Sequence, residues 1–464
     1  MAIKPPDLLN RLPSVSELLE KPPIRALADR WNRSVVAGGV RTFLEELRSD
    51  FERRAADLPS IRELAERAAR FVVSRQHHSL GVAINATGRI CGSPWTSTPL
   101  AEAALERMIA LGREYATEPG AASTKARSEL QSALCRLTGS PAAAVVHSYS
   151  GALWLALAAL AADREVLVAR AEVGDVEGAD SLPKLAAAAN TALKEVGATN
   201  RTTAADYEAA VSPRAAAILK LSNDSYRVVG ETAAAELDEL VALARDRELL
   251  SIDVLGAAPL VTPPAAIVWP RRSAQASLAA GADLVIIRGD ALVGGPACGI
   301  LLGRYEVIRR VVEHPLFAAW QLDPLRTAAL TATLACCDSP SLGADSVPVW
   351  QCLSTSVENL HNRADRMAAQ LAHVEGVASA SAVETRSPIS EALLGEGWPS
   401  YGVALAAADG ELASLENRLQ TARVPIFGRL EGDRIILDLR TVLPRQDKSL
   451  VDALLGPNTP QTVA

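Results

Sequence analysis

Short strand-like runs alternate with alanine-rich helical runs through the middle of the chain. The strand-like runs are apolar and rich in β-branched residues, and they occupy residues 145–146, 165–169, 217–221, 249–253 and 282–287. Strands that alternate with helices favour a mostly parallel sheet covered by helices on both faces. Ligands of such sheets bind beyond the carboxyl ends of the strands. The pattern therefore predicts an α/β domain whose functional site lies near Asp253 and the loop after residue 287.

The two ends of the chain follow other patterns. Before residue 75, apolar positions recur with helical spacing among many arginines. After His314, helical runs are followed by a strand, by a hairpin with turn residues at 431–433, and by a last helix near 448–455. We therefore expect three domains, which are a helical domain over residues 1–75, a large α/β domain over 76–320 and a small α+β domain over 321–464.

Composition narrows the choice of partners and compartment. The 464 residues carry a formal net charge of −7, which is not the balance of a protein built to bind polyanions. The arginines before residue 75 are compatible with a solvated helical surface or with a module that contacts RNA phosphates. The sequence shows no signal peptide and no apolar stretch of membrane-spanning length. The six cysteines have no metal-ligand spacing, so we expect free thiols and no metal. Together, these features predict a cytoplasmic protein with neither membrane nor DNA as a partner.

One loop carries most of the chemical information. The last β-branched run leads into Gly289-Asp290-Ala291, and the turn Gly294-Gly295-Pro296 follows. Many pyridoxal-phosphate enzymes place on such a loop the lysine that holds the cofactor as a Schiff base. The segment resembles the loop of the bacterial selenocysteine synthase family, the L-seryl-tRNA(Sec) selenium transferases. That family has its lysine where this chain has Ala291, and a methyl group cannot form an imine.

The resemblance extends over nearly the whole chain. Its other motifs follow the family's order, at residues 12–19, 84–88, 137–152, 196–207, 424–429 and 437–442. The resemblance implies a fold-type I pyridoxal-phosphate transferase architecture with a helical N-terminal module that makes tRNA a candidate partner. It also implies a homo-oligomer built from dimers, with subunit interfaces near residues 84–100 and after His314.

The resemblance also assigns a cofactor site. Asp253 corresponds to the aspartate that binds the pyridine nitrogen, and Ser148, Tyr149, Ser150 and Gly151 stand where donors to the phosphate are expected. Simple helix capping by Ser148 or Ser150 is an equal alternative. Arg288 replaces a serine of the family. It could bind an anion or pair with Asp290 or Asp283. The predicted cofactor-binding residues are therefore Ser148, Tyr149, Ser150, Gly151, Asp253, Arg288 and Asp290.

Other changes accompany the missing lysine. Several arginines of the family are replaced, and their positions hold Ser97, Ala122, Lys125, Ala318 and Gln321. Lys220 lies on another strand and is a poor substitute for the missing amine. We therefore predict no catalytic residue and pyridoxal phosphate that is either absent or not covalently bound. A catalytically degenerate scaffold is favoured over a working selenium transferase. It is also favoured over an enzyme of another class that uses Tyr149, His147, Asp253 or Asp290 as acid or base.

Overall fold

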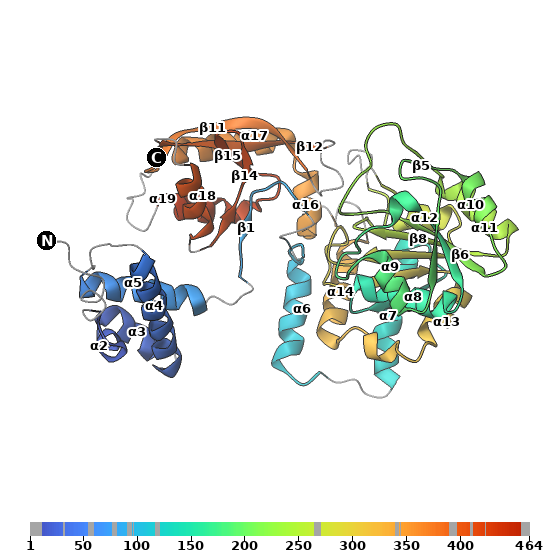
Figure 1. Ribbon diagram of the computed structural model, residues 1–464, viewed down its shortest axis with the longest axis horizontal. Helices are drawn as coiled ribbons and strands as arrows, with labels where there is room; N and C mark the ends of the chain where they lie inside the picture. Colours follow the sequence, from blue (N-terminus) through green and yellow to red (C-terminus); the bar gives the residue numbers. More distant parts are fainter. Residues whose placement is uncertain are drawn as a thin grey trace. The chain divides into compact units, whose positions relative to one another are not determined.

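The chain forms two compact units, Met1–Ala83 and Ile84–Ala464 (Figure 1). The computed structural model describes residues 12–30, 33–53, 60–76, 81–90, 95, 97–116, 121–263, 271–338, 343, 345–388, 397–408, 412–422 and 424–455. Parts of the predicted helical domain and of the predicted subunit interface, and the side chains of Ala122 and Lys125, lie outside this description. Among the described residues, no helix combines the length and the apolar character that a bilayer crossing requires.

The first unit is helical, as its apolar spacing predicts. Its helices are α2 (Val15–Leu19), α3 (Pro22–Arg30), α4 (Arg33–Arg53) and α5 (Ile61–Gln76). Buried Leu18, Ile24, Val40 and Leu64 belong to one core. Helix α4 approaches α5 closely, because a side chain at Gly39 would come within 2.9 Å of Val72 Cγ2.

A seven-stranded sheet forms the centre of the second unit. Its strands, in spatial order, are β2 (Ala142–Val146), β10 (Gly299–Gly303), β9 (Leu284–Arg288), β8 (Leu250–Gly256), β6 (Ala215–Leu221), β3 (Glu165–Ala169) and β4 (Ala192–Val196). Strand β10 runs antiparallel to both of its neighbours, and the pairs β9–β8, β8–β6, β6–β3 and β3–β4 are parallel. The predicted mostly parallel α/β sheet is therefore confirmed.

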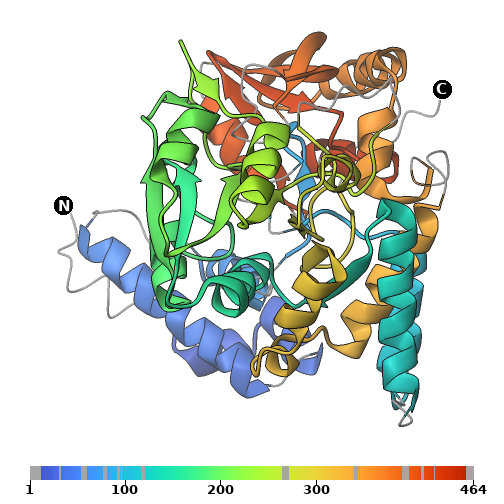
Figure 2. The ribbon, with the colours of Figure 1, turned by 90° about the vertical axis from the view of Figure 1, so that its right-hand side faces the viewer.

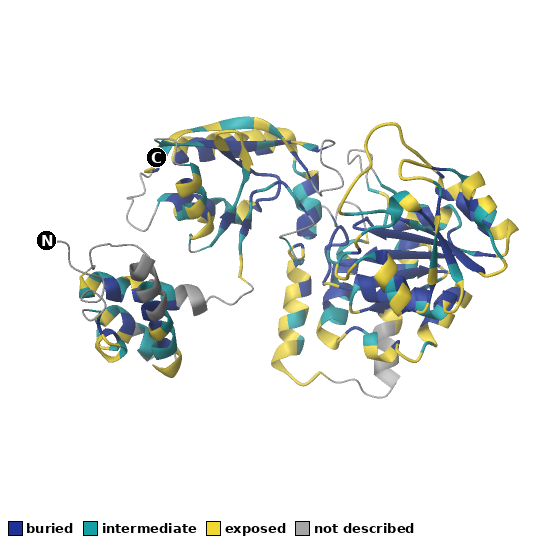
Figure 3. Cartoon of the chain, viewed as in Figure 1, coloured by how far each residue is buried: buried dark blue, intermediate teal, exposed yellow. Residues whose placement is uncertain are grey.

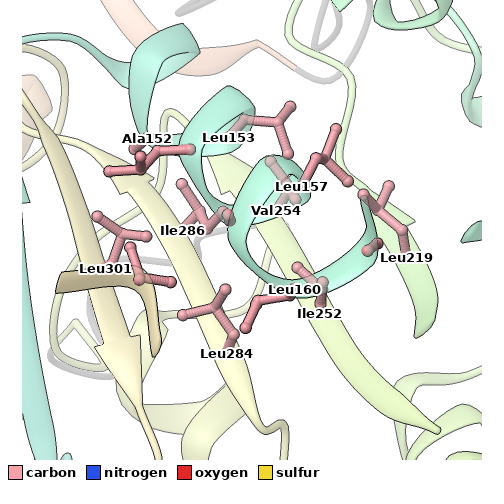
Figure 4. Packing of buried hydrophobic residues seen from close by; sticks show 14 of the residues in the cluster. Ala152, Leu153, Leu157, Leu160, Leu219, Ile252, Val254, Leu284, Ile286 and Leu301 are labelled. Carbon is pink, nitrogen blue, oxygen red and sulfur yellow. The ribbon is translucent and has the colours of Figure 1, made fainter. Parts of the chain in front are cut away.

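Helices cover both faces of this sheet (Figure 1 and Figure 2). On one face, Leu157 of α8 (Tyr149–Ala161) packs with Ile252, Ile286 and Leu301 (Figure 4). Successive residues of a strand point to opposite faces, so Ile287 packs on the other side. The helices of that side are α7 (Ala121–Thr138), α12 (Ala274–Ala279) and α14 (Pro324–Cys336). The central strands are buried throughout, whereas the outer helix faces are exposed (Figure 3).

Shorter elements connect and flank the sheet. They are α6 (Glu102–Arg113), η1 (Arg170–Glu172), α9 (Leu182–Ala188), β5 (Arg201–Thr202), α10 (Ala204–Ala210), β7 (Ala233–Ala234), α11 (Leu237–Asp246), α13 (Tyr305–Val312) and η2 (Ala318–Trp320). Strands β5 and β7 pair in parallel beside the end of β4 and extend this edge of the domain.

The C-terminal part holds a second, antiparallel sheet in the order β11 (Val377–Ser387), β12 (Trp398–Ala407), β15 (Arg434–Asp438) and β14 (Arg429–Glu431). The helices of this part are α16 (Pro348–Ser354), α17 (Val357–Leu371), α18 (Leu412–Gln420) and α19 (Asp447–Leu455). The predicted hairpin turns at Gly432, which has φ +60°. This part of the second unit therefore combines helices with an antiparallel sheet.

The chain enters the second unit through this C-terminal part. Strand β1 (Ile84–Asn85) pairs in parallel with β13 (Ile426–Phe427). Ile84 and Ala86 also belong to the same hydrophobic core as Leu437. This segment therefore packs with the C-terminal sheet, although the sequence places it in the 76–320 domain.

Candidate functional site

The loop after β9 fixes position 291 inside the protein. Gly289 N–H donates to Cys298 O and Gly295 N–H donates to Gly289 O, each at 2.9 Å, so the loop folds back on itself. Thr98 Oγ1 lies 3.2 Å from the carbonyl oxygens of Asp290 and Ala291. The Ala291 side chain is fully buried and packs against Ala257, which follows β8. The side chain at position 291 is therefore a buried methyl group, which offers no amine.

Arg288, at the end of β9, is almost fully buried and is matched by carboxylates. Its Nε donates to Asp290 Oδ1 at 3.0 Å, and its guanidinium lies 3.7 Å from Glu177 Oε1. Burial disfavours the charged form, but Asp290 and Glu177 outweigh it and raise the pKa of Arg288 above its usual value. Of the two predicted ion pairs, the one with Asp290 forms, and Asp283 instead pairs with Arg304. Arg288 therefore remains a cation whose charge is already neutralised.

Two charged residues that the sequence did not single out complete this cluster. Asp224 pairs with Arg271, and its Oδ2 accepts from Ala257 N–H at 2.9 Å. This approach depends on Gly256, since a Cβ there would overlap the Asp224 carboxylate. Burial and, next, Asp224 raise the pKa of Tyr149, so its hydroxyl stays protonated. Asp224 follows β6, so the rule that ligand sites lie beyond strand ends could have indicated it. Arg271 follows a proline-rich stretch and gives no such signal.

The amino end of α8 is occupied by contacts within the chain. Ser148 caps the helix, because its Oγ accepts from Gly151 N–H at 3.1 Å. Ser150 Oγ donates to Gly178 O at 3.1 Å. The Trp320 ring lies so close to Gly151 that a Cβ there would overlap it. The hydroxyl oxygens of Ser148 and Ser150 therefore each have a hydrogen-bond partner within the chain, and Trp320 lies against the first turn of α8.

Asp253 lies deeper in the sheet than the sequence suggests. The sequence places it at the end of its strand, but β8 continues to Gly256, so Asp253 lies mid-strand. Its Oδ2 accepts from Ser277 Oγ at 2.6 Å and lies 3.8 Å from Arg272 Nε. Its Oδ1 has no hydrogen-bond partner among the described residues. Burial raises the pKa of Asp253, and Ser277 and Arg272 offset only part of this effect.

Of the remaining predicted positions, Lys220 lies opposite Asp253 on the neighbouring strand, and the other described ones are exposed or half-buried. Lys220, on β6, donates to Ala235 O at 2.8 Å and pairs with Glu172. Ser97 and Ala318 are exposed, and Gln321 is half-buried. No group of three or more possible metal ligands occurs within the described ranges.

Comparison with known proteins decides the family. The sequence pattern described as "L-seryl-tRNA selenium transferase" matches residues 83–443, and the one described as "Selenocysteine synthase N terminal" matches residues 9–48. The chain belongs to the L-seryl-tRNA selenium transferase family. The selenium transferase of Hyphomonas neptunium is 31% identical over 455 residues, which cover 96% of this chain and 98% of that protein. That of Moorella thermoacetica is 32% identical over 466 residues, or 97% of each.

Solved structures agree with the fold. The structure of D-glucosaminate-6-phosphate ammonia-lyase superposes with a TM-score of 0.59 at 17% identity and covers 82% of this chain and 96% of that chain. This chain thus has a fold-type I pyridoxal-phosphate transferase architecture.

The residues of this family member do not fit covalently held pyridoxal phosphate. Ala291 offers no amine, Ser148 and Ser150 make hydrogen bonds within the chain, and the Trp320 ring lies against Gly151. The unpaired Oδ1 of Asp253 could accept a hydrogen bond from a pyridine nitrogen. Without an amine at position 291, the described residues therefore do not fit a Schiff-base linkage to the cofactor.

The buried carboxyl of Asp253 is expected to make the stability of the folded protein depend on pH. Its pKa is higher in the folded than in the unfolded protein, so the unfolded chain releases this proton first as pH rises. Folded stability therefore falls as pH rises from the unfolded-state pKa to the folded-state pKa. We expect Asp253→Asn, which has no proton to release, to gain in Tm over the unchanged protein from acid to neutral pH. Thermal unfolding across this range measures the difference.

A matched control lies on the surface. Lys184 lowers the pKa of the exposed Asp180 carboxyl through a hydrogen bond, so Asp180→Asn should show the opposite and smaller trend. If Asp253→Asn lowers the Tm at neutral pH, the folded protein needs the negative charge of Asp253 and the prediction is wrong.

Proposed function

We propose that this chain is a catalytically degenerate L-seryl-tRNA(Sec) selenium transferase, which keeps the scaffold of the family without its Schiff-base chemistry. The observation that carries this proposal is the buried methyl group of Ala291 at the lysine position, packed against Ala257. The neutralised charge of Arg288 and the cover of Trp320 over α8 support it. Because Ser97, Ala318 and Gln321 carry no charge and Arg288 is already paired with carboxylates, capture of an anionic selenium donor is also expected to be weak.

A selenium-transfer assay tests the proposal. The purified protein is incubated with serylated tRNA(Sec) and an activated selenium donor, and the Moorella thermoacetica relative serves as the positive control. We expect selenium incorporation with the relative and none above background with this chain. Turnover by this chain, with or without added pyridoxal phosphate, would refute the proposal. Filter binding of the same seryl-tRNA at rising salt shows in parallel whether the substrate is held, since phosphate contacts weaken steeply with salt.

Transfer RNA is the candidate partner of the N-terminal unit. Its support is the match of residues 9–48 to the family's N-terminal region and the presence of exposed arginines such as Arg25 and Arg41. Acidic neighbours weaken this support, because Arg33 pairs with Glu20 at 3.2 Å. If tRNA is not retained at low salt, the scaffold binds a protein partner instead.

We also propose a homo-oligomer built from dimers. Exposed apolar side chains on α6 and at the start of α14 support it, with exposed fractions of 52% for Ile109, 37% for Leu105 and 36% for Leu325. A second copy would remove this surface from water. Light scattering is expected to show a dimer or larger species that Ile109→Lys shifts towards monomer, while the control Tyr305→Lys on α13 does not. A stable monomer of the unchanged protein at micromolar concentration would contradict this prediction.

A further inference from the structure

A second cavity, separate from the Ala291 loop, lies at the carboxyl ends of β3 and β6. Its volume is about 220 Å³. Polar and apolar side chains both line the cavity, among them Glu172, Thr199, Asn200, Tyr207, Lys220 and Val228. Ala291, Arg288 and Asp253 are not part of this lining, and Lys220 lies opposite Asp253 on the neighbouring strand. The carboxyl ends of parallel strands are where α/β sheets bind ligands.

A buried ion pair forms one wall of this cavity. The side chains of Glu172 and Lys220 are 15% and 13% exposed, and Lys220 Nζ lies 3.5 Å from Glu172 Oε1. Each has one further partner on the backbone. Glu172 Oε2 accepts from Leu221 N–H at 2.8 Å, and Lys220 Nζ donates to Ala235 O at 2.8 Å. The Glu172–Lys220 pair, whose charged atoms lie 3.5 Å apart, therefore offers a bound ligand one negative and one positive group. A ligand with a single charge would be attracted by one of them and repelled by the other.

A tyrosine hydroxyl in the same wall is an independent sign of a ligand. Tyr207 is 1% exposed, and its hydroxyl has no hydrogen-bond partner in the described part of the chain. Burial and, next, Glu172 raise its pKa, so the hydroxyl keeps its proton and can donate. An unpaired buried hydroxyl costs free energy that a bound acceptor would recover.

The size of the cavity and its apolar wall limit the ligand further. Drug-sized ligands occupy about 300–1,000 Å³, so this cavity suits a smaller molecule. Val228 and short alanine side chains, including Ala233, form the apolar part of the lining. This wall would contact a short aliphatic group and leaves no further charge to satisfy.

We propose that this cavity binds a small zwitterion of the α-amino acid class with a short aliphatic side chain. Its ammonium group lies at Glu172 Oε1, and its carboxylate accepts from Lys220 Nζ and the Tyr207 hydroxyl. Ala291 does not line this cavity, so the proposed amino-acid binding can be tested separately from the loss of selenium transfer.

Isothermal titration of the full-length protein tests the site with three probes. L-alanine carries both charges, propionate lacks the ammonium group and ethylamine lacks the carboxylate. We expect one L-alanine per chain and at least about tenfold weaker binding of either analogue, because each leaves one partner of the ion pair unmatched. Tyr207→Phe removes one hydrogen bond and is expected to weaken L-alanine binding about tenfold. Glu172→Gln should weaken it further.

A control variant and a stability measurement separate loss of the site from loss of the fold. Tyr305→Phe changes an exposed tyrosine on α13 and should leave binding unchanged. Since the Tyr207 hydroxyl has no partner, Tyr207→Phe should not lower the Tm, and a loss of binding would then report the site and not the fold. No heat with L-alanine at millimolar concentration would overturn the proposal, as would binding that Tyr207→Phe leaves intact or propionate binding as tight as that of L-alanine.

Discussion

Replacing Ala291 with lysine is expected to give a borohydride-reducible pyridoxal phosphate adduct at position 291, where the unchanged protein forms none. The substitution restores an amine at the carboxyl ends of β8 and β9, on a loop that internal hydrogen bonds hold in place. Absorbance in the visible range before reduction and peptide mass spectrometry after it measure the result. The expected change is from no labelling to labelling of a large fraction of the protein.

The same substitution should cost stability in the absence of cofactor. Ala291 is fully buried against Ala257, so a lysine there must displace packed neighbours, at about 1–3 kcal/mol. Bound cofactor would recover part of this loss by mass action. Full selenium transfer is not expected, because Ser97, Ala318 and Gln321 still lack the charges of the family's arginines.

Ala297→Lys is the matched control, since it places a lysine on an exposed position of the same loop. It should neither form a specific adduct nor destabilise the fold. An adduct on the unchanged protein, for example at Lys220, would show that another amine has taken over the role. No adduct at position 291 in Ala291→Lys would show that Trp320 and the engaged start of α8 exclude the cofactor even when an amine is present.

The spacing of apolar residues along the sequence was sufficient to predict the strands whose side chains are buried at regular intervals. The β-branched runs of β3, β6, β8 and β9 form the parallel strands because their apolar residues fill both sheet faces. Strand β10 was missed because its short apolar run is bounded by glycines and reverses direction after a tight loop. Strand β11 was missed because most of its side chains are polar or small, and its register comes from pairing with β12.

The candidate site was harder to predict because its contacts are tertiary. The residue types at positions 288, 290 and 291 were readable from one loop. Arg271 reaches Asp224 from a distant segment, and no local pattern indicates this pair. Trp320 likewise covers Gly151 from an element far along the chain. The sequence therefore indicates an alanine on this loop, but only the fold shows which side chains fill the surrounding space.

Loss of Arg440 is expected to have the largest effect on the C-terminal part of the protein. This buried guanidinium follows β15 and donates to the carbonyls of Cys352 and Thr355 at 3.0 Å, and to that of Pro399. It thereby ties the end of α16 to the start of β12. Arg440→Leu keeps an apolar stem but leaves these buried acceptors unsatisfied, so we expect a loss of about 3–5 kcal/mol. Urea unfolding, with hydrogen exchange of β12 and β15, measures it.

Arg434→Leu separates this effect from the simple loss of a charge. Arg434 lies on the neighbouring strand β15, its side chain is 54% exposed, and it forms an ion pair with the exposed Asp433 at 3.7 Å. Exposed pairs contribute about 0–1 kcal/mol, so its removal should change unfolding little. Burial lowers the pKa of Arg440, which shows that the fold sustains a cost to keep this group inside. If Arg440→Leu unfolds no more easily than Arg434→Leu, the carbonyls find other donors and the guanidinium is not the link between α16 and β12.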